Sequence, residues 1–121
     1  MSAPLDPREL VRFVVEECWP GLDGLDRMEE HLAPGYVHHT PFGDLTFEQF
    51  RQGLAWVETI FTARTYRVEH TIVEGDMVAA YLSWGGTRQA DASPVEGRGT
   101  YHCRITGEGI QEDWDVFFPT S

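Results

Sequence analysis

The C-terminal run from Gly99 to Phe118 constrains the fold of this chain more than any other stretch. Two extended segments, 100–105 and 110–118, are rich in β-branched and aromatic residues and flank the tetrapeptide Thr-Gly-Glu-Gly at 106–109. Glycine adopts the positive φ values that a tight reversal needs, so the pattern predicts a β-hairpin. A chain that ends in this way must build at least part of its structure as a sheet.

The second strand of this hairpin carries two carboxylates. Asp113 and Asp115 are two residues apart, and alternate residues of a strand share a face. The nearby residues Trp114, Phe117 and Phe118 are aromatic. Burying a carboxylate among aromatic rings is costly unless it is paired or used, so both aspartates are candidate functional residues. Simple alternation leaves open the opposite interpretation, in which Asp115 is solvated on an outer face and Trp114 lies in the core.

The first half of the chain shows helical periodicity instead. Amphipathic helices are expected over residues 7–18, 22–32 and 46–61. Asp6 supplies an acidic cap before Pro7 at the first helical position. Thr46 begins the third helix, and Gln49 three positions later completes a capping box.

From Tyr66 onwards the hydrophobic period changes to two. Strands are expected over 66–73, 77–84, 94–105 and 110–118, besides a short extended segment at 36–40. Gly85-Gly86 is expected to bend or end the second of these strands, and Gly97 with Gly99 suggests a bulge or bend in the third. Helices followed by strands predict a single α+β domain over residues 1–121, with three N-terminal helices on one face of a curved antiparallel sheet.

Charge and composition restrict the partners. The formal net charge of −11 argues against nucleic acid or an anionic membrane, because phosphate binding requires a basic face. No apolar run approaches the ~18 residues of a membrane span, and the first residues do not form a signal-peptide pattern. Two cysteines, Cys18 and Cys103, do not make a disulfide framework. The sequence therefore predicts a soluble, cytoplasmic protein.

Three motifs resemble the SnoaL-like polyketide cyclase family. They are Tyr-Val-His-His-Thr-Pro at 36–41, Val-Glu-Gly-Asp-Met-Val at 73–78 and Arg-Ile-Thr-Gly-Glu-Gly-Ile-Gln-Glu-Asp-Trp-Asp-Val at 104–116. That family belongs to the nuclear-transport-factor-two-like superfamily of cone-shaped α+β domains, with ketosteroid isomerase and limonene epoxide hydrolase among its relatives. The resemblance covers nearly the whole chain and implies a pocket enclosed by sheet and helices, and a homodimer through the convex sheet face. It does not fix the chemistry, because the superfamily holds isomerases, cyclases, hydrolases and non-catalytic binders.

Taken residue by residue, the resemblance places the catalytic acid/base aspartate of the cyclases at Asp115. The strand position of a catalytic acid or histidine in related enzymes matches Tyr101. The family's Tyr-Val-x-His motif matches 36–39, and the resemblance favours His39 rather than His38 facing the pocket. Thr40 occupies the position of the isomerases' general base, which argues against steroid isomerisation. The arginine–aspartate pair of the epoxide hydrolases finds no counterpart around 81–84.

The hairpin register supplies further candidates. With the turn at 107–108, Thr100 lies opposite Asp115 and His102 opposite Asp113, which makes His102 a candidate partner of the carboxylates. Two close carboxylates cannot both ionise easily, so Asp113 is a candidate catalytic residue, with a surface acid or a salt bridge as the alternative. Ligand-binding side chains are expected at Tyr36, Trp56, Trp84, His102 and Phe117. No metal-site spacing and no nucleotide fingerprint occurs, so neither a metal nor a cofactor is expected.

These residues together predict a cofactor-independent enzyme for a small, hydrophobic, oxygen-bearing substrate. Asp115 would move a proton next to a carbonyl group, as in polyketide cyclisation or isomerisation. Tyr101, His39 or His102 would stabilise the developing oxyanion. Two alternatives stay open: epoxide opening by a water molecule that Asp115 activates, and a non-catalytic domain that binds a small ligand or dimerises.

Overall fold

The structure is a computed structural model and describes residues 6–120. Its helical elements are α1 (Pro7–Phe13), the π-helical turn η1 (Val14–Cys18), α2 (Leu22–Glu29) and α3 (Phe47–Val57). Its strands are β1 (Leu32–Thr40), β2 (Gly43–Leu45), β3 (Phe61–Glu74), β4 (Met77–Arg88), β5 (Pro94–Thr106) and β6 (Gly109–Pro119). None of the helices in this part of the chain is long and apolar enough to cross a membrane.

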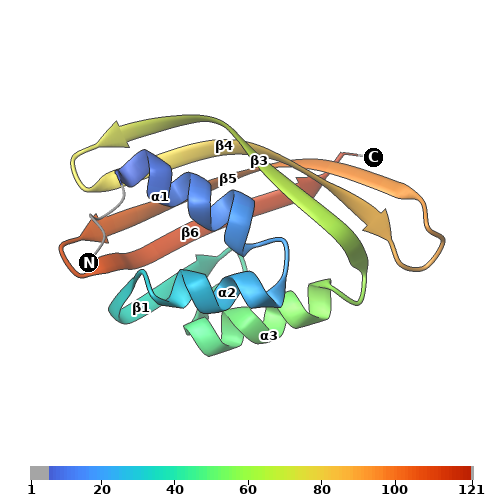
Figure 1. The fold of residues 1–121 in the computed structure, drawn as a ribbon, viewed down its shortest axis with the longest axis horizontal. Helices are drawn as coiled ribbons and strands as arrows, with labels where there is room; N and C mark the ends of the chain where they lie inside the picture. Colours follow the sequence, from blue (N-terminus) through green and yellow to red (C-terminus); the bar gives the residue numbers. More distant parts are fainter. Residues whose placement is uncertain (1–5, 121) are drawn as a thin grey trace.

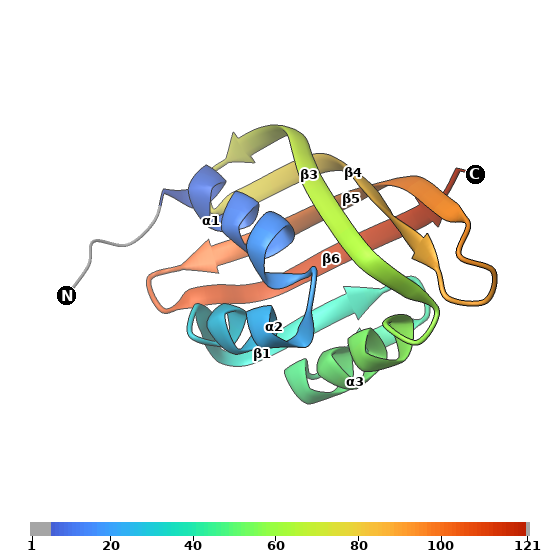
Figure 2. The same ribbon diagram turned by 45° about the vertical axis from the view of Figure 1, so that its right-hand side comes forward.

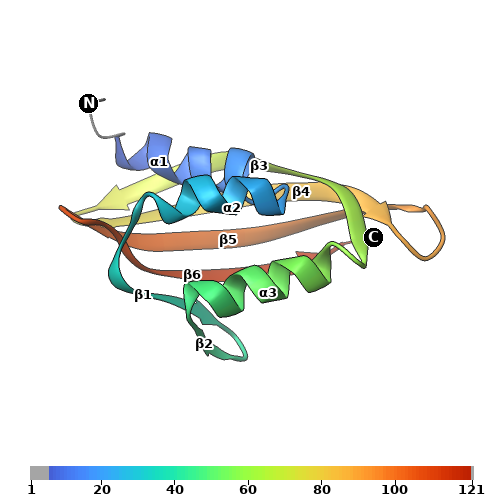
Figure 3. The ribbon, with the colours of Figure 1, turned by 60° about the horizontal axis from the view of Figure 1, so that its bottom comes forward.

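The strands form one curved sheet in the order β2-β1-β6-β5-β4-β3. The helices gather on one side of it, with α1 packed toward β3 and β4, α2 in front of β1, and α3 beside β1 (Figures 1 and 2). Figure 3 shows α3 against β1 and β2 at one end of the curved sheet. The α+β architecture expected from the sequence is confirmed, with one difference: β1 pairs in parallel with β6, so the sheet is mixed.

The helix starts follow the predicted capping chemistry. The Asp6 side chain accepts a hydrogen bond from the Arg8 backbone N–H at 2.8 Å. At α3 the Gln49 N–H donates to the Thr46 hydroxyl at 3.1 Å, and the Gln49 side chain accepts from the Thr46 N–H at 2.9 Å. The apolar faces of α1, η1 and α2 then bury against the concave side of the sheet. This core includes Val11, Val14, Val15, Leu25, Met28, Val78, Leu82 and Ile110.

Several boundaries differ from the sequence-based expectation. Helix α3 ends at Val57, and Phe61 opens β3 instead of closing the helix. Strand β1 begins at Leu32, and β4 continues through Gly85-Gly86 with unbroken pairing to β5. Tertiary packing explains why Phe61 belongs to β3 and not to the helix. Its ring lies edge-on to Trp84 across the β3–β4 pair, with 5.6 Å between ring centroids.

Gly97 and Gly99 serve packing rather than bending. Both lie in regular register between β4 and β6, without the expected bulge. A Cβ atom at Gly97 would overlap the indole nitrogen of Trp84, and one at Gly99 would overlap the ring of Phe117. The two glycines therefore leave room for the aromatic rings of Trp84 and Phe117 to lie directly on β5.

A bulge does occur one strand further on, and it resets the register of the hairpin. Arg104 pairs with Glu112 while Ile105 pairs with Ile110, so Gln111 is an extra residue in β6. Asp115 consequently lies opposite Tyr101, and the predicted pairing of Asp115 with Thr100 and of Asp113 with His102 is wrong by one residue. A one-residue shift exchanges the faces of a strand, so the side chains of Asp113, Asp115 and Phe117 share the concave face with Ile110.

Candidate active site

A cavity of about 610 Å³ opens on the concave side of the sheet beside α3. Its walls are mainly apolar and include Phe50, Leu54, Val57, Phe61, Trp84 and Phe117. Four ionisable side chains line it: His38 from β1, Arg64 and Tyr66 from β3, and Asp115 from β6. Within the described part of the chain, Asp115 is the one carboxylate that lines this cavity.

Behind the cavity wall, Asp113 is completely buried and fully hydrogen-bonded. The Tyr36 hydroxyl lies 2.8 Å from both carboxylate oxygens, and the Tyr101 hydroxyl donates to Oδ2 at 2.7 Å. His38 Nδ1 lies 2.6 Å from Oδ1. Because its accessible surface is zero, Asp113 has no contact with the cavity, and its direct effect is on the three side chains that it holds.

His38 connects Asp113 to the carboxylate in the cavity. Its other ring nitrogen, Nε2, lies 3.2 Å from Asp115 Oδ1. Burial alone would lower the pKa of His38, but hydrogen bonds to Asp113 and Asp115 outweigh it and raise that pKa to about 9. With a carboxylate at each nitrogen, His38 is an imidazolium near neutral pH, donating from both sides. We call this arrangement the Asp113–His38–Asp115 chain.

Strand alternation and the parallel β1–β6 pairing position these groups. His38 is the register partner of Asp113 on the neighbouring strand, so the two side chains meet on the concave face. The ring of Phe50 on α3 packs edge-on against the imidazole, with 4.4 Å between centroids. Asp115 follows two residues after Asp113 and projects further along the same face, into the cavity.

The family model described as "SnoaL-like domain" matches residues 12–112, most of the chain. The chain belongs to the SnoaL-like family. A comparison with curated proteins gives no match for this SnoaL-like domain.

Solved structures share its fold at low sequence identity. IdmH from Streptomyces antibioticus, provisionally assigned as a polyketide cyclase, matches with a TM-score of 0.80 and 20% identity over 93% of this chain and 92% of its own. A provisionally assigned SnoaL-like polyketide cyclase from Jannaschia sp. CCS1 matches with a TM-score of 0.79 and 18% identity, covering 98% and 92%. A protein with a ketosteroid isomerase-like fold from Catenulispora acidiphila, in complex with trimethylamine, gives 0.74 and 20%, covering 93% and 86%. At such identities the likeness establishes the fold alone.

In this SnoaL-like domain the two adjacent histidines take the places opposite to those expected. His39 points to the convex side, where it stacks on Trp114 and lies 2.7 Å from Asp44 and 2.9 Å from Glu112. The expectation that His39 faces the pocket is therefore wrong, and His38 faces it instead. Tyr36 and His38 are two residues apart, so the choice of Tyr36 as an inward residue already implied the same for His38.

Three other candidates lie outside the cavity. The hydroxyls of Tyr36 and Tyr101 are engaged by Asp113, and neither ring lines the cavity wall. His102 is on the convex face, stacked on Trp114 with ring centroids 4.6 Å apart, because the bulge at Gln111 moved its partner by one position. The structure thus brings Asp113 together with Asp115 through His38, and not through His102.

The remaining candidates do line the cavity, together with residues that sequence reasoning missed. Trp56, Trp84, Phe117 and Asp115 all contribute to its walls, and their functional roles remain predictions. Arg64 was missed because β3 begins five residues before the predicted strand start, and Tyr66 was assigned to the strand but not to the site. Thr40 also lines the cavity, but its hydroxyl donates to the Gly43 carbonyl at 2.8 Å and accepts from the Phe42 N–H at 3.1 Å.

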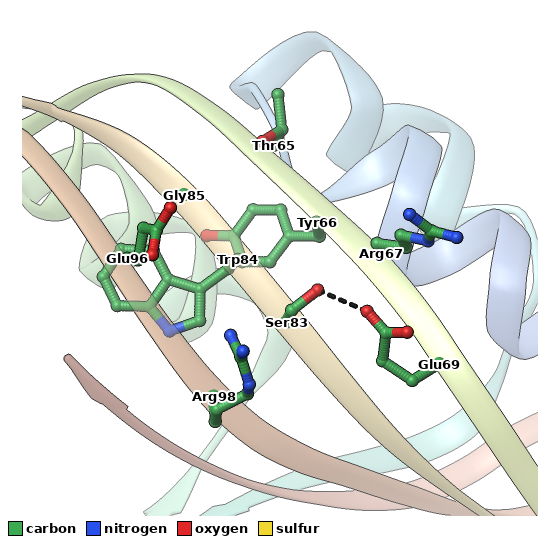
Figure 4. Close-up of a pocket in the computed structure, with 9 residues that line it drawn as sticks. All are labelled: Thr65, Tyr66, Arg67, Glu69, Ser83, Trp84, Gly85, Glu96 and Arg98. Carbon is green, nitrogen blue, oxygen red and sulfur yellow. Dashed lines mark hydrogen bonds between the residues drawn. The ribbon is translucent and has the colours of Figure 1, made fainter. Parts of the chain in front are cut away.

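A second pocket, of about 470 Å³, lies along β3, β4 and β5 (Figure 4). Charged groups of both signs surround it, including Arg67, Glu69, Glu96 and Arg98, and Ser83 donates a hydrogen bond to Glu69 at 2.7 Å. None of the predicted catalytic residues lines it. The apolar cavity with Asp115 is therefore the better candidate for an active site.

Proposed function

We propose that this SnoaL-like domain is a cofactor-independent enzyme in which Asp115 moves a proton on a small, hydrophobic, oxygen-bearing substrate. One observation carries the proposal: a carboxylate that borders an apolar cavity is held by a buried imidazolium at 3.2 Å. A positioned acid/base group in a water-poor cavity is what proton transfer at carbon requires.

The size and the walls of the cavity support a small apolar substrate. Its volume of about 610 Å³ falls in the usual range of small-molecule sites, roughly 300–1,000 Å³. Aromatic walls such as Phe50, Trp84 and Phe117 suit a flat, partly unsaturated ring system. The charges in the lining are paired within the protein, His38 with Asp115 and Arg64 with Glu58, which suits a neutral substrate.

The Asp113–His38–Asp115 chain suggests how the base works. Asp115 accepts a proton from a carbon next to a carbonyl group and returns it elsewhere on the product. His38 orients the carboxylate through Nε2, and Asp113 fixes the ring through Nδ1. The most concrete version is an intramolecular aldol-type cyclisation of a polyketide-like compound, in line with the cyclase assignments of IdmH and the Jannaschia protein.

The test is the exchange of the α-hydrogens of 2-tetralone, a hydrophobic ketone, for deuterium in D₂O, followed by NMR. The wild-type protein should accelerate exchange over buffer. Asp115→Asn keeps the shape and a hydrogen-bond acceptor for His38 but removes the base, so the rate should fall roughly 100-fold or more. Asp23→Asn, a substitution at an exposed aspartate of α2, is the matched control and should exchange at the wild-type rate. Equal rates for wild-type protein and Asp115→Asn would refute the proposal.

Epoxide opening is the second candidate activity, and one observation favours it. The guanidinium of Arg64 shares the cavity with Asp115, so a cation is present for the oxygen that becomes negative when the ring opens. Incubation with styrene oxide and chiral analysis of the diol separates the two candidates. Enantiomerically enriched diol, formed by the wild-type protein without ketone exchange, would favour the epoxide activity and overturn the first.

A further inference from the structure

Within the described part of the chain, the cavity offers few hydrogen-bond donors to a substrate oxygen. The Thr40 hydroxyl is already donor and acceptor within its own turn. The indole nitrogens of Trp19 and Trp84 are buried without a partner, and that of Trp84 is packed over Gly97 on β5. Trp56 is 65% exposed, so water competes for its N–H. Tyr66 and Arg64 remain.

The Tyr66 hydroxyl has its oxygen engaged and its hydrogen available. Arg64 Nη1 donates to that oxygen at 2.8 Å, and no acceptor for the hydroxyl hydrogen occurs in the described part of the structure. A hydroxyl that accepts a hydrogen bond from a cation is polarised and becomes a stronger donor. Tyr66 also lines the cavity, so this donor is in place for a ligand oxygen.

Arg64 is held rigidly for this role. Its Nη2 group donates to the Pro20 carbonyl at 3.3 Å and to Glu58 at 3.2 Å, and only 1% of its side-chain surface is accessible. The guanidinium is thus fixed by three neighbours, and its charge is balanced by Glu58. A fixed cation behind the phenol polarises it without any cost of rearrangement during a reaction.

The backbone is shaped locally to place Arg64 there. The pairing of β3 with β4 shifts between Thr62 and Thr65, and Ala63 has a φ of 51°. A positive φ is unfavourable for alanine, so this bend persists only because its surroundings impose it. Gly86 on β4 faces the bend, and a Cβ atom there would approach the Arg64 side chain to 3.3 Å.

Tyr66 stays protonated and lines the same cavity as the proposed base. Burial raises the pKa of Tyr66 most, Arg64 lowers it, and the negative charge of Asp115 raises it further. The phenol is therefore a neutral donor at physiological pH. It lies on β3 and Asp115 on β6, so base and donor approach the cavity from different strands.

We propose that Tyr66 is the oxyanion donor of this site, that Arg64 positions and polarises it, and that the substrate is a ketone bound with its oxygen on Tyr66 and its α-carbon toward Asp115. This inference rests on the proposed function. In the step, Asp115 takes the α-proton, the C–H electron pair forms the C=C bond of the enolate, and the carbonyl π pair moves to oxygen. The Tyr66 O–H then stabilises that negative oxygen. This role replaces the ones expected for Tyr101, His39 and His102.

The first test compares Tyr66→Phe with wild-type protein in the 2-tetralone exchange assay. Loss of one oxyanion donor should lower kcat by roughly 100- to 1,000-fold while KM changes little. Tyr81→Phe removes a hydroxyl from the convex face and should have no effect. Loss of exchange in Asp115→Asn with full activity in Tyr66→Phe would overturn this inference alone. Full activity in Asp115→Asn would overturn the proposed function instead.

The second test needs no turnover. In the Asp115→Asn background, the infrared C=O stretch of bound 2-tetralone should shift to lower frequency than in water-free solvent, because Tyr66 polarises the carbonyl. Tyr66→Phe should abolish that shift, and Arg64→Lys, which keeps a cation but not the fork of donors, should reduce it. An unchanged C=O frequency in Tyr66→Phe would place the carbonyl elsewhere and refute the assignment.

Discussion

His38 is a single residue whose charge couples the stability of this domain to pH. Hydrogen bonds to Asp113 and Asp115 overcome the effect of burial and raise its pKa from 6.5 to about 9. The folded state therefore binds a proton more tightly than the unfolded chain. The stabilisation is complete below pH 6.5 and is lost as the pH rises through 9.

We predict that the unfolding free energy of wild-type protein, relative to His38→Gln, falls by about 3 kcal/mol between pH 6 and pH 10. The measurement is urea unfolding at several pH values, followed by tryptophan fluorescence. His70→Gln, at an exposed histidine of β3, is the control and should show no such pH-dependent difference from wild type. A difference between wild type and His38→Gln that does not vary with pH would contradict the charged state assigned to His38.

Asp113 allows a second prediction at the same scale. It accepts hydrogen bonds from Tyr36, Tyr101 and His38 inside the core. Asp113→Leu leaves these donors buried without an acceptor, so the protein should lose roughly 3–5 kcal/mol of stability or fail to fold. Asp113→Asn keeps the shape and one acceptor oxygen and should lose less. Thermal unfolding of both variants decides the point, and two variants as stable as wild type would contradict this role of Asp113.

At the scale of elements, β5 supports the cavity through its glycines. Gly99 lies under the ring of Phe117, a wall of the cavity, and any side chain there must displace that ring. We predict that Gly99→Ala costs about 1–3 kcal/mol of stability and weakens 2-tetralone binding. Gly107→Ala in the β5–β6 turn meets no atom within 4 Å and should be neutral in both measurements. Chemical denaturation and fluorescence titration test the pair, and a stable, fully binding Gly99→Ala would contradict the packing role.

The elements that local chemistry dictates were predictable. Asp6 and Thr46 are capping residues that mark the starts of α1 and α3. The change of hydrophobic period at Tyr66 separates the helices from the strands. The bulge at Gln111 was not predictable, because no residue type there demands it and only the combined fit of β5 and β6 creates it. A shift by one residue exchanges the two faces of a strand. Because of this bulge, both aspartates of β6 point inward, and His102 on β5 does not lie opposite either of them.

Contacts in the site between residues far apart in the chain were also not predictable from the sequence. His38 meets Asp113 through a parallel pairing of β1 with β6, a contact across 75 positions that hydrophobic periodicity does not encode. Arg64 enters the cavity through a bend at Ala63, a residue with no intrinsic preference for that backbone shape. Asp115 was found because a family motif marks it, and the inward position of His38 followed from its spacing to Tyr36, whereas Arg64 and Tyr66 required the three-dimensional arrangement.

At the scale of the whole molecule, the convex face of the sheet is unusually apolar for a surface. Ile72 and Phe118 are each 65% exposed there, and Tyr81 and Val116 are each 38% exposed. The register places them on one face of β3, β4 and β6, with β5 between the last two, in rows that also contain Trp114. Arg67, Glu69, Glu96 and Arg98 add charges of both signs, although the chain as a whole carries a net charge of −11.

We propose that this face binds a second copy of the chain, the homodimer that the family resemblance implies. Mixed charges allow two identical faces to approach without net repulsion, and buried aromatic and aliphatic side chains supply the association energy. Analytical ultracentrifugation should show a dimer, and the pair of substitutions Ile72→Lys and Phe118→Lys should shift it to monomer. Phe42→Lys changes an equally apolar, 99% exposed residue beside the cavity and should leave the dimer intact. A wild-type monomer at micromolar concentration would contradict the proposal, and the concave cavity would then have to function within a single chain whose outer apolar face remains in water.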